Sequence, residues 1–257
     1  MTFSIATWNV NSLRVRLPQL LEWLAANAPD VVALQETKLT DDAFPAAELA
    51  AAGYQSLANG QKTYNGVALL AKAALAEPER ELPGFDDPQR RVLAATVRDL
   101  RIVNLYVPNG QAVGSDKYAY KLGWLAALCD WLRAQLASRP RMVVLGDFNI
   151  APEDRDVHDP AAWVGSVHVS EPERAALREL RALGYEDVFR RFEQPPGAYT
   201  WWDYRQGAFR RNHGLRIDLI LASPALAPRC RACRIDVAPR RAERASDHAP
   251  VLASFDI

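Results

Sequence analysis

The chain has 257 residues, and 49% of them are hydrophobic, which predicts one domain over residues 1–257 with a sizeable buried core. Its 31 lysine and arginine residues balance 31 aspartate and glutamate residues, which excludes binding to nucleic acid through a large overall positive charge. Three cysteines cannot form a closed set of disulfides, and no stretch has the roughly 18 consecutive apolar residues of a membrane helix, so we expect a cytoplasmic protein without membrane contact.

Short apolar runs rich in β-branched residues alternate with segments of helical periodicity, a pattern that indicates an α/β fold. Strands are expected at 3–8, 31–34, 67–71, 92–97, 102–107, 142–145, 217–221 and 251–255. One helix should open at Pro18 and end before Pro29, and a longer one should cover 118–136. A third helix should follow Ser170, because Ser170 and Glu173 have the spacing of a capping box.

Polar residues occur at or just beyond the ends of three predicted strands. Asn9 and Asn11 follow the first strand, Glu36 follows the second, and Asp147 and Asn149 follow the sixth. Strand ends are where a layered sheet protein can gather side chains from distant parts of the sequence into one pocket. Simpler interpretations remain open: Glu36 as a helix cap or surface acid, and Asp147 and Asn149 as turn-stabilising side chains.

Two further acidic positions suggest chemistry. Asp218 interrupts an apolar strand, where an unpaired buried carboxylate would be costly, so it needs a partner or a function. Asp247 precedes His248 just before the last strand, an arrangement suited to orienting and charging the imidazole. Together with the acids and amides above, these residues suit a hard cation such as Mg²⁺, a base for water and a cationic donor to phosphate. The set therefore predicts hydrolysis of a phosphate ester.

Five segments resemble the successive motifs of the exonuclease III family and span almost the whole chain. They are TWNVN at 7–11, LQETK at 34–38, LGDFN at 145–149, GLRIDL at 214–219 and SDHAP at 246–250. The segment WWDYR at 201–205 is similar to one that separates this DNA-repair branch from relatives such as DNase I, inositol-phosphate phosphatases and sphingomyelinases. The resemblance implies a four-layer α/β sandwich, with two mixed β-sheets packed face to face, helices outside, and a site at one edge of the sheets.

The resemblance also implies roles for the polar residues. Glu36 with Asn9 would hold Mg²⁺, for which Mn²⁺ would substitute, and Asp247 would lie near the ion. Asp147 would activate or orient the attacking water, and Asn149 would bind phosphate or position Asp147.

Four more residues complete the implied site. Asp218 would orient the water-activating pair, and His248, backed by Asp247, would stabilise the charged transition state. Tyr106, in the segment NLYVPNG at 104–110, matches a family tyrosine near the leaving group, although the sequence alone suits a core aromatic better. Asn11 is expected to contact the substrate.

Residues outside these motifs are expected to contact DNA. Trp202 and Phe209 would present an apolar surface to the sugar of an abasic site, with core packing as the alternative. Lys121, Arg90 and Arg91 are expected to contact backbone phosphates, which positions DNA without reading its sequence.

Two features favour DNA ends over continuous duplex. His168 lies in a long irregular segment, 149–169, which the resemblance places near the substrate groove, where its ring would obstruct continuous duplex; a surface histidine is the alternative. Arg210 and Arg211 are bulkier and more basic than the site requires, and they would favour gaps or termini by binding an extra phosphate.

The predicted function is a magnesium-dependent DNA-repair phosphodiesterase that acts as a monomer on double-stranded DNA with abasic sites, nicks or damaged 3′ ends. It would cleave 5′ to abasic sites, remove 3′ blocking groups and 3′ nucleotides, or do both. One alternative is a 3′-end-specific exonuclease and 3′-phosphatase with little activity at internal abasic sites. Others are a phosphatase for a small phosphate ester and an inactive binding module, although every matched catalytic position holds the expected residue type.

Overall fold

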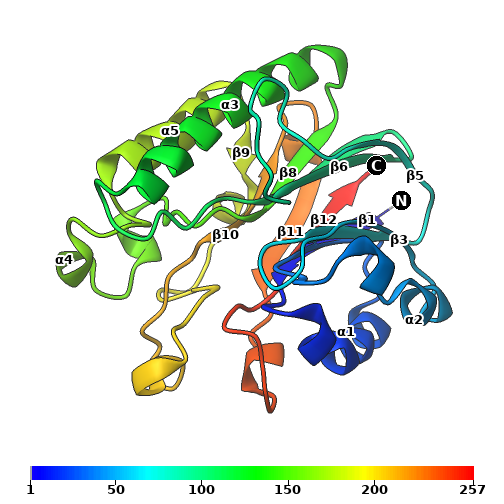
Figure 1. The fold of residues 1–257 in the computed structure, drawn as a ribbon, viewed down its shortest axis with the longest axis horizontal. Helices are drawn as coiled ribbons and strands as arrows, with labels where there is room; N and C mark the ends of the chain where they lie inside the picture. The colour runs from blue at the N-terminus through cyan, green and yellow to red at the C-terminus, as the bar shows by residue number, and fades with distance from the viewer. Residues whose placement is uncertain (1) are drawn as a thin grey trace.

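Two six-stranded mixed sheets pack face to face in the computed structural model, which describes residues 2–257 (Figure 1). The first sheet contains β1 (Thr2–Asn9), β2 (Val31–Gln35), β3 (Gln55–Asn59), β4 (Val67–Ala71), β11 (Cys230–Ile235) and β12 (Val251–Asp256). The second contains β5 (Leu75–Glu79), β6 (Val92–Val97), β7 (Leu100–Tyr106), β8 (Met142–Asp147), β9 (Glu186–Asp187) and β10 (Asp218–Ala222). Their spatial orders are β11-β12-β1-β2-β4-β3 and β5-β6-β7-β8-β10-β9. The pairs β1–β2 and β7–β8 are parallel, and the other neighbours are antiparallel.

Helices cover the outer face of each sheet (Figure 1). The first sheet carries α1 (Leu13–Asn27) and α2 (Ala46–Ala51), and the second carries α3 (Asp116–Ser138) and α5 (Glu171–Ala182). The short helix α4 (Pro160–Trp163) lies within a long connection between β8 and α5. The order helix, sheet, sheet, helix gives the four layers expected from the sequence. Among residues 2–257, no helix combines the length and apolar character needed to cross a membrane.

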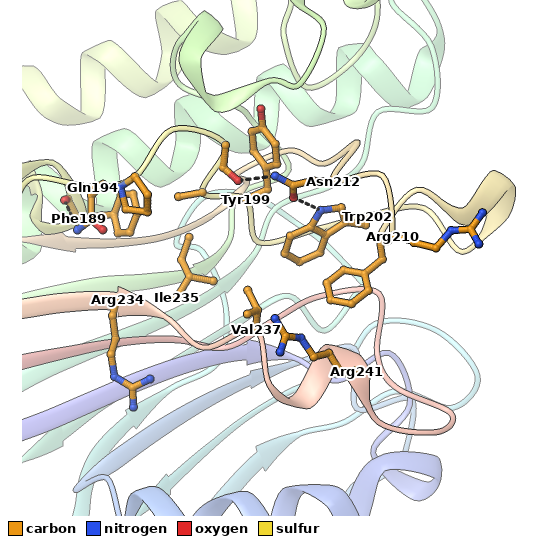
Figure 2. A pocket seen from close by; sticks show the side chains of 14 residues that line it. Phe189, Gln194, Tyr199, Trp202, Arg210, Asn212, Arg234, Ile235, Val237 and Arg241 are labelled. Carbon is orange, nitrogen blue, oxygen red and sulfur yellow. Dashed lines mark hydrogen bonds between the residues drawn. The ribbon is translucent and has the colours of Figure 1, made fainter.

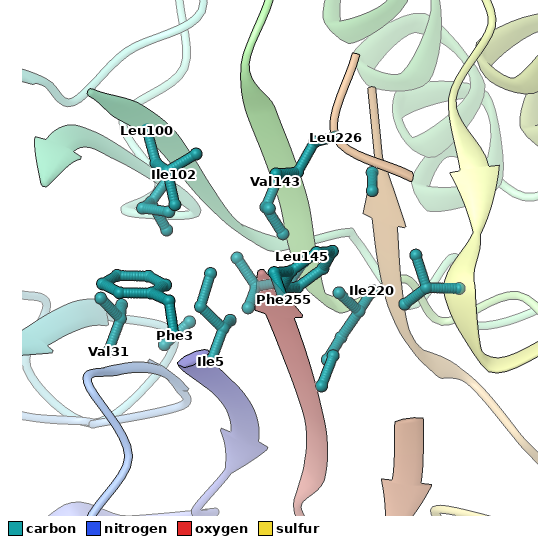
Figure 3. Packing of buried hydrophobic residues seen from close by; sticks show 14 of the residues in the cluster. Phe3, Ile5, Val31, Leu100, Ile102, Val143, Leu145, Ile220, Leu226 and Phe255 are labelled. Atoms are coloured by element: carbon teal, nitrogen blue, oxygen red, sulfur yellow. The ribbon is translucent and has the colours of Figure 1, made fainter. Parts of the chain in front are cut away.

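The largest buried cluster fills the space between the two sheets (Figure 3). Ile5 of β1 and Phe255 of β12 join Val143 and Leu145 of β8 and Ile220 of β10 in this cluster. All five are fully buried, and each contributes roughly 1.5–3 kcal/mol by leaving water. The core therefore holds together two sheets that both supply residues to the site described below.

A buried polar connection also joins the two sheets. Asn104 of β7 donates to the backbone oxygens of Leu34 (2.9 Å) and Ala68 (2.8 Å) in the other sheet. Gln35 donates to the Asn104 side-chain oxygen (2.7 Å) and to the Thr7 hydroxyl (2.9 Å). We call the side chains of Thr7, Gln35 and Asn104 the amide bridge. Because a buried polar group without a partner is costly, this bridge fixes how the sheets lie on one another.

All eight strands expected from the sequence are present, and they are the interior strands of the two sheets. The four strands that were not assigned, β3, β5, β9 and β11, are the sheet edges. An edge strand is partly exposed and needs no continuous apolar run, and β5 even contains Pro78.

The expected start of the first helix at Pro18 is wrong. The helix begins at Leu13, and Pro18 lies inside it. Proline has no N–H, so the carbonyl of Arg14 loses its usual donor four residues later. The helix forms because Leu20 and Leu24 bury one of its faces against the first sheet.

Candidate active site

Polar side chains from both sheets come together at one edge, where the strands end. Asn9 ends β1, Glu36 follows β2, Asp147 ends β8, Asp218 begins β10 and His248 precedes β12. The register of the β8–β10 pair places Asp147 opposite Asp218. The strand-end residues singled out from the sequence therefore lie in one region, although they are far apart along the chain.

Gly146 allows Asp147 to reach this position. Its φ is 145°, and a Cβ built there would lie 1.9 Å from the backbone oxygen of Leu105 on β7. Any side chain would push β8 away from β7 and displace the carboxylate that follows. Glu36 (φ 51°) and Asn149 (φ 50°) also have left-handed backbones, a strained conformation that tends to occur at functional sites.

Glu36 and Asp147 face each other across the amide of Asn9. The Asn9 nitrogen donates to Glu36 Oε1 (2.9 Å) and to Asp147 Oδ2 (2.9 Å). Ligand atoms of Glu36, Asp147 and His248 lie within 4.8 Å of one another, so this group could hold a metal ion. Its two carboxylates are the ligand type that a hard divalent cation prefers.

Two expected metal ligands have other partners. The Asn9 carbonyl oxygen accepts from the backbone N–H of Asn11 (3.0 Å), which turns the amide nitrogen toward the acids. Asp247 accepts from the Asn11 side chain (2.9 Å) and from the Trp201 indole (3.0 Å). Glu36 and Asp147 are thus the carboxylates that converge, and Asn9 and Asp247 as metal ligands stay a prediction.

The partner of His248 is Asp218, and not the neighbouring Asp247 as expected. His248 Nδ1 lies 2.9 Å from Asp218 Oδ2, while Nε2 lies 3.8 Å from Asp147 Oδ2. The Asp247 carboxylate is instead occupied by Asn11 and Trp201, so it does not hydrogen-bond the ring that follows it. Asp218 thus orients the imidazole, which corrects the expectation that it orients Asp147 and Asn149.

Burial and neighbouring acids set the charges of His248 and Asp147. Burial opposes a charge on His248, but attraction by Asp218 and then by Asp147 raises its pKa to about 10. Burial raises the pKa of Asp147 to about 7, although the attraction of His248 acts against this rise. At neutral pH the imidazole therefore carries a proton, and Asp147 is poised to accept one.

Asn149 holds Asp147 in place. Its backbone N–H donates to Asp147 Oδ1 (2.9 Å), and its side-chain nitrogen donates to the backbone oxygen of Val107 (3.0 Å) and to Asp147 Oδ2 (3.3 Å). The sequence left open whether Asn149 binds phosphate or positions Asp147. These contacts match the positioning role.

Tyr106 lies beside the acids and under Arg91, a residue that lines a groove. Burial and then Glu36 raise the pKa of Tyr106 well above its ordinary value, so the phenol keeps its proton and can donate it to a hydrogen bond. Arg91 lies 4.7 Å from the centre of the Tyr106 ring and lines a cavity of about 820 Å³ together with Asn109 and Tyr64. Tyr64 and Asn109 were not identified from the sequence, because neither interrupts an apolar strand.

The basic residues expected to contact phosphate have different surroundings. Arg91 lines the groove, and the side chain of Arg90 is 39% exposed with its guanidinium 3.5 Å from Glu81. Arg210 and Arg211 are both exposed, and Arg211 lines a small cavity beside Trp201.

Lys121 is completely buried, so the expectation that it contacts a DNA phosphate is wrong. Its ammonium contacts Glu173 and donates to the backbone oxygens of Asn149 (2.8 Å) and Asn109 (3.2 Å). Glu173 is also the acid of the capping box with Ser170, which is confirmed at the start of α5. Lys121 therefore ties α3 to α5 and to the segment that carries Asn149.

Trp202 and Phe209 lie in a separate cavity of about 650 Å³, lined by residues from 189–212 and 234–241 (Figure 2). Trp202 is 2% exposed, donates to Asn212 (3.0 Å) and packs edge-on against Phe209. The core-packing alternative therefore describes Trp202 better than contact with an abasic sugar. The adjacent Trp201 points to the opposite side and donates to Asp247, so Trp201 is the tryptophan of this pair that faces the site.

His168 forms part of the wall beside Asn149. Its Nδ1 donates to the Asn149 backbone oxygen (2.6 Å), and its Nε2 lies 3.4 Å from the Asn109 amide nitrogen. Burial and then the nearby Lys121 ammonium lower the pKa of His168 to about 4, so the ring is neutral. With 7% of its surface exposed, His168 is not the surface histidine considered as the alternative.

Comparisons with known proteins agree over nearly the whole chain. Residues 6–248 match the endonuclease/exonuclease/phosphatase family. The sequence is 35% identical to the exodeoxyribonuclease III of Haemophilus influenzae, over 97% of this chain and 98% of that protein. The structure superposes on a Neisseria 3′ phosphatase bound to a product DNA hairpin, with 48% identity and a TM-score of 0.97, over 99% of this chain and 100% of that one. An AP endonuclease from Archaeoglobus fulgidus gives 39% identity and a TM-score of 0.96 over the same shares.

Proposed function

The chain belongs to the endonuclease/exonuclease/phosphatase family, and on that premise we propose that it is a magnesium-dependent DNA-repair phosphodiesterase of the exodeoxyribonuclease III type that acts mainly on 3′ ends. The single observation that carries the hydrolytic assignment is the convergence of Glu36, Asp147 and His248 within 4.8 Å at the sheet edge. The choice of 3′ ends rests on His168.

The charges at the site support attack by water on a phosphate ester. Asp147, with its pKa near 7, would accept a proton from the attacking water. The protonated His248, oriented by Asp218, would donate to a phosphate oxygen as negative charge grows on it. Asn149 would keep the Asp147 carboxylate in position for both steps.

The carboxylate of Glu36 would hold Mg²⁺ beside Asp147, and Mn²⁺ would substitute for it. When bound, the ion supplies Lewis-acid stabilisation of the charged phosphate. Such stabilisation is needed because enzymes that hydrolyse phosphate esters must lower the barrier by on the order of 20 kcal/mol.

The position of His168 supports a preference for 3′ ends. Its neutral ring fills space between Asn149 and Trp201, and the ring centres of His168 and Trp201 lie 6.4 Å apart. A continuous strand passing Asn149 would have to displace this ring, whereas a strand that ends at the site would not. Of the two solved structures described above, the 3′ phosphatase has the higher sequence identity to this chain.

Incision at internal abasic sites is the second candidate activity. The likeness to the archaeal AP endonuclease favours it, and so does the groove lined by Tyr64, Arg91 and Asn109, which offers room for substrate. We also propose that the protein works as a monomer on double-stranded DNA in the cytoplasm, where its three free cysteines would remain reduced.

The test compares two duplexes in Mg²⁺, one with a 3′ phosphate at a nick and one with an internal abasic-site analogue. Wild type should remove the 3′ phosphate much faster than it cuts the abasic site, and Asp147→Asn should lose both activities. His168→Gly should raise cleavage at the abasic site and keep 3′ phosphate removal, because glycine removes the ring and suits a φ of 76°.

Equal cleavage of the abasic duplex by wild type and His168→Gly would reject His168 as the cause of the preference. Efficient wild-type cleavage of the abasic duplex would instead establish the second candidate. Failure of the wild type on both duplexes would reject the DNA assignment and favour a small phosphate ester as substrate.

A further inference from the structure

The cavity beside Trp202 and Phe209 has an apolar floor and a basic rim (Figure 2). Its volume of about 650 Å³ lies within the range of about 300–1,000 Å³ that is common for binding sites. Glu36, Asp147 and His248 do not line it, so its occupant is not the reacting phosphate. Apolar side chains make up most of the lining, and they include Phe189, Tyr199, Ile235 and Val237.

Three arginines give this cavity a positive charge. They are Arg210, Arg234 and Arg241, and no aspartate or glutamate in the described part of the chain lines the cavity with them. Arg234 donates to the side chain of Asn27 (2.9 Å) and lies 3.8 Å from the Asp236 carboxylate, which offsets part of its charge. Arg210 and Arg241 are exposed and make no hydrogen bond or ion pair with any residue that the structure describes. Two positive charges are therefore available to an anionic partner.

The aromatic rings of the cavity offer little free face to a nucleic-acid base. Phe189 and Trp202 are each 2% exposed. The Phe209 ring packs edge-on against Trp202, and the Arg240 guanidinium lies over it at 4.9 Å. Stacking of a base requires an accessible ring face. The cavity therefore suits a flexible apolar side chain better than a base.

The cavity also lies at an edge of the first sheet. β11 is the outermost strand of that sheet, and its last two residues, Arg234 and Ile235, line the cavity. The side-chain amide of Gln194 donates to the backbone oxygen of Cys233 (3.1 Å), so this edge accepts hydrogen bonds from amide groups. An extended peptide offers such donors along its whole length, whereas DNA has no backbone amides. The strand edge thus favours a peptide over nucleic acid.

We propose that this cavity binds an acidic segment of a partner protein. One large apolar side chain of the segment would fill the cavity, and its carboxylates would lie against Arg210 and Arg241. The apolar anchor supplies most of the affinity, and the opposite charges speed association and select the partner. The site recruits the enzyme and takes no part in hydrolysis, so the inference goes beyond the proposed function and does not depend on the substrate.

The first experiment measures binding of synthetic peptides to the full chain by fluorescence anisotropy. The probe is a fluorescein-labelled peptide in which a run of aspartates precedes Leu-Phe. One matched peptide has asparagine in place of aspartate, and the other has alanine in place of Leu-Phe. Each should bind on the order of tenfold more weakly than the probe, because each lacks one of the two features that the cavity recognises. Binding of the probe should also weaken as salt is added, because the rim is open to solvent.

The variants change the rim and the floor separately. Arg241→Gln should weaken binding of the probe several-fold, and Val237→Asp should weaken it on the order of tenfold or more, because a carboxylate would replace part of the apolar floor. Both variants should keep 3′ phosphate removal. Arg244→Gln is the matched control and should bind the probe as wild type does, because Arg244 is an exposed arginine of the same connection that does not line the cavity. Arg241→Gln alters an exposed side chain, so it tests the cavity whatever Val237→Asp does to folding.

Equal binding of the three peptides, or no binding of the probe to wild type, would overturn the inference. So would a loss of affinity in Arg244→Gln as large as that in Arg241→Gln. A single-stranded oligonucleotide that displaces the probe, and that itself binds Arg241→Gln and Val237→Asp more weakly, would assign the cavity to nucleic acid instead. Self-association of the wild type that Val237→Asp abolishes would assign it to a second copy of this chain.

Discussion

Replacing Lys121 by methionine tests whether this lysine is structural or contacts DNA. Lys121 and Glu173 are both 0% exposed, and removing one partner of a buried ion pair typically costs about 3–5 kcal/mol. Glu173 would keep three other donors, the backbone N–H groups of His168 (3.0 Å) and Ser170 (3.1 Å) and the Ser170 hydroxyl. We therefore expect the lower end of that range, about 3 kcal/mol of the free energy of unfolding.

The assay is reversible unfolding by urea and heat. For a chain of this size, a loss of about 3 kcal/mol lowers Tm by roughly 6–12 °C. Lys121→Met with Glu173→Gln removes both charges, and a double-mutant cycle should return a coupling energy of at least about 1 kcal/mol. The slope of log K for DNA binding against log salt concentration should stay unchanged in Lys121→Met. In Arg91→Ala the magnitude of this slope should fall by about 1, because the variant makes one phosphate contact fewer and releases one counterion fewer. A Tm within about 1 °C of wild type, or a reduced salt slope in Lys121→Met, would refute the structural role.

Three further predictions concern the chemistry. The pH profile of kcat/KM should rise through about pH 7, because Asp147 can act as a base only after it has lost its proton. It should fall near pH 10, because His248 then loses the proton that it donates. A flat profile from pH 6 to 9 would contradict these roles. Asp218→Asn removes the main attraction that raises the pKa of His248. The alkaline limb of the profile should therefore move to lower pH, and kcat should fall on the order of 10²-fold. If the alkaline limb does not move, Asp218 does not set the pKa of His248. EDTA should abolish activity, and added Mg²⁺ or Mn²⁺ should restore it; full turnover in EDTA would rule out the carboxylate metal site.

The sequence predicted the interior of the fold and the gathering of polar residues at one edge, because both follow from strong local patterns. A strand buried on both faces must be apolar throughout, so an Asp at its end or an Asp within it stands out. The edge strands were not assigned because partial exposure removes that pattern.

The hydrogen-bond partners of the site residues could not be predicted in the same way. Whether Asp218 or Asp247 orients His248, and whether Trp201 or Trp202 faces the site, depends on which side of an extended segment each residue occupies. A shift of one residue reverses every such assignment, and register is set by contacts distant in sequence.

The amide bridge has a consequence for how this enzyme would fail. Glu36 and His248 come from the first sheet, whereas Asp147 and Asp218 come from the second, so the reacting geometry exists only while the two sheets keep their alignment. The hydrogen bonds of the bridge fix the position of one sheet relative to the other, whereas apolar packing alone would allow the sheets to slide. Substitutions at Gln35 or Asn104 that preserve side-chain volume should therefore leave the protein folded but shift the catalytic residues of one sheet relative to those of the other. Activity should fall more than the free energy of unfolding does.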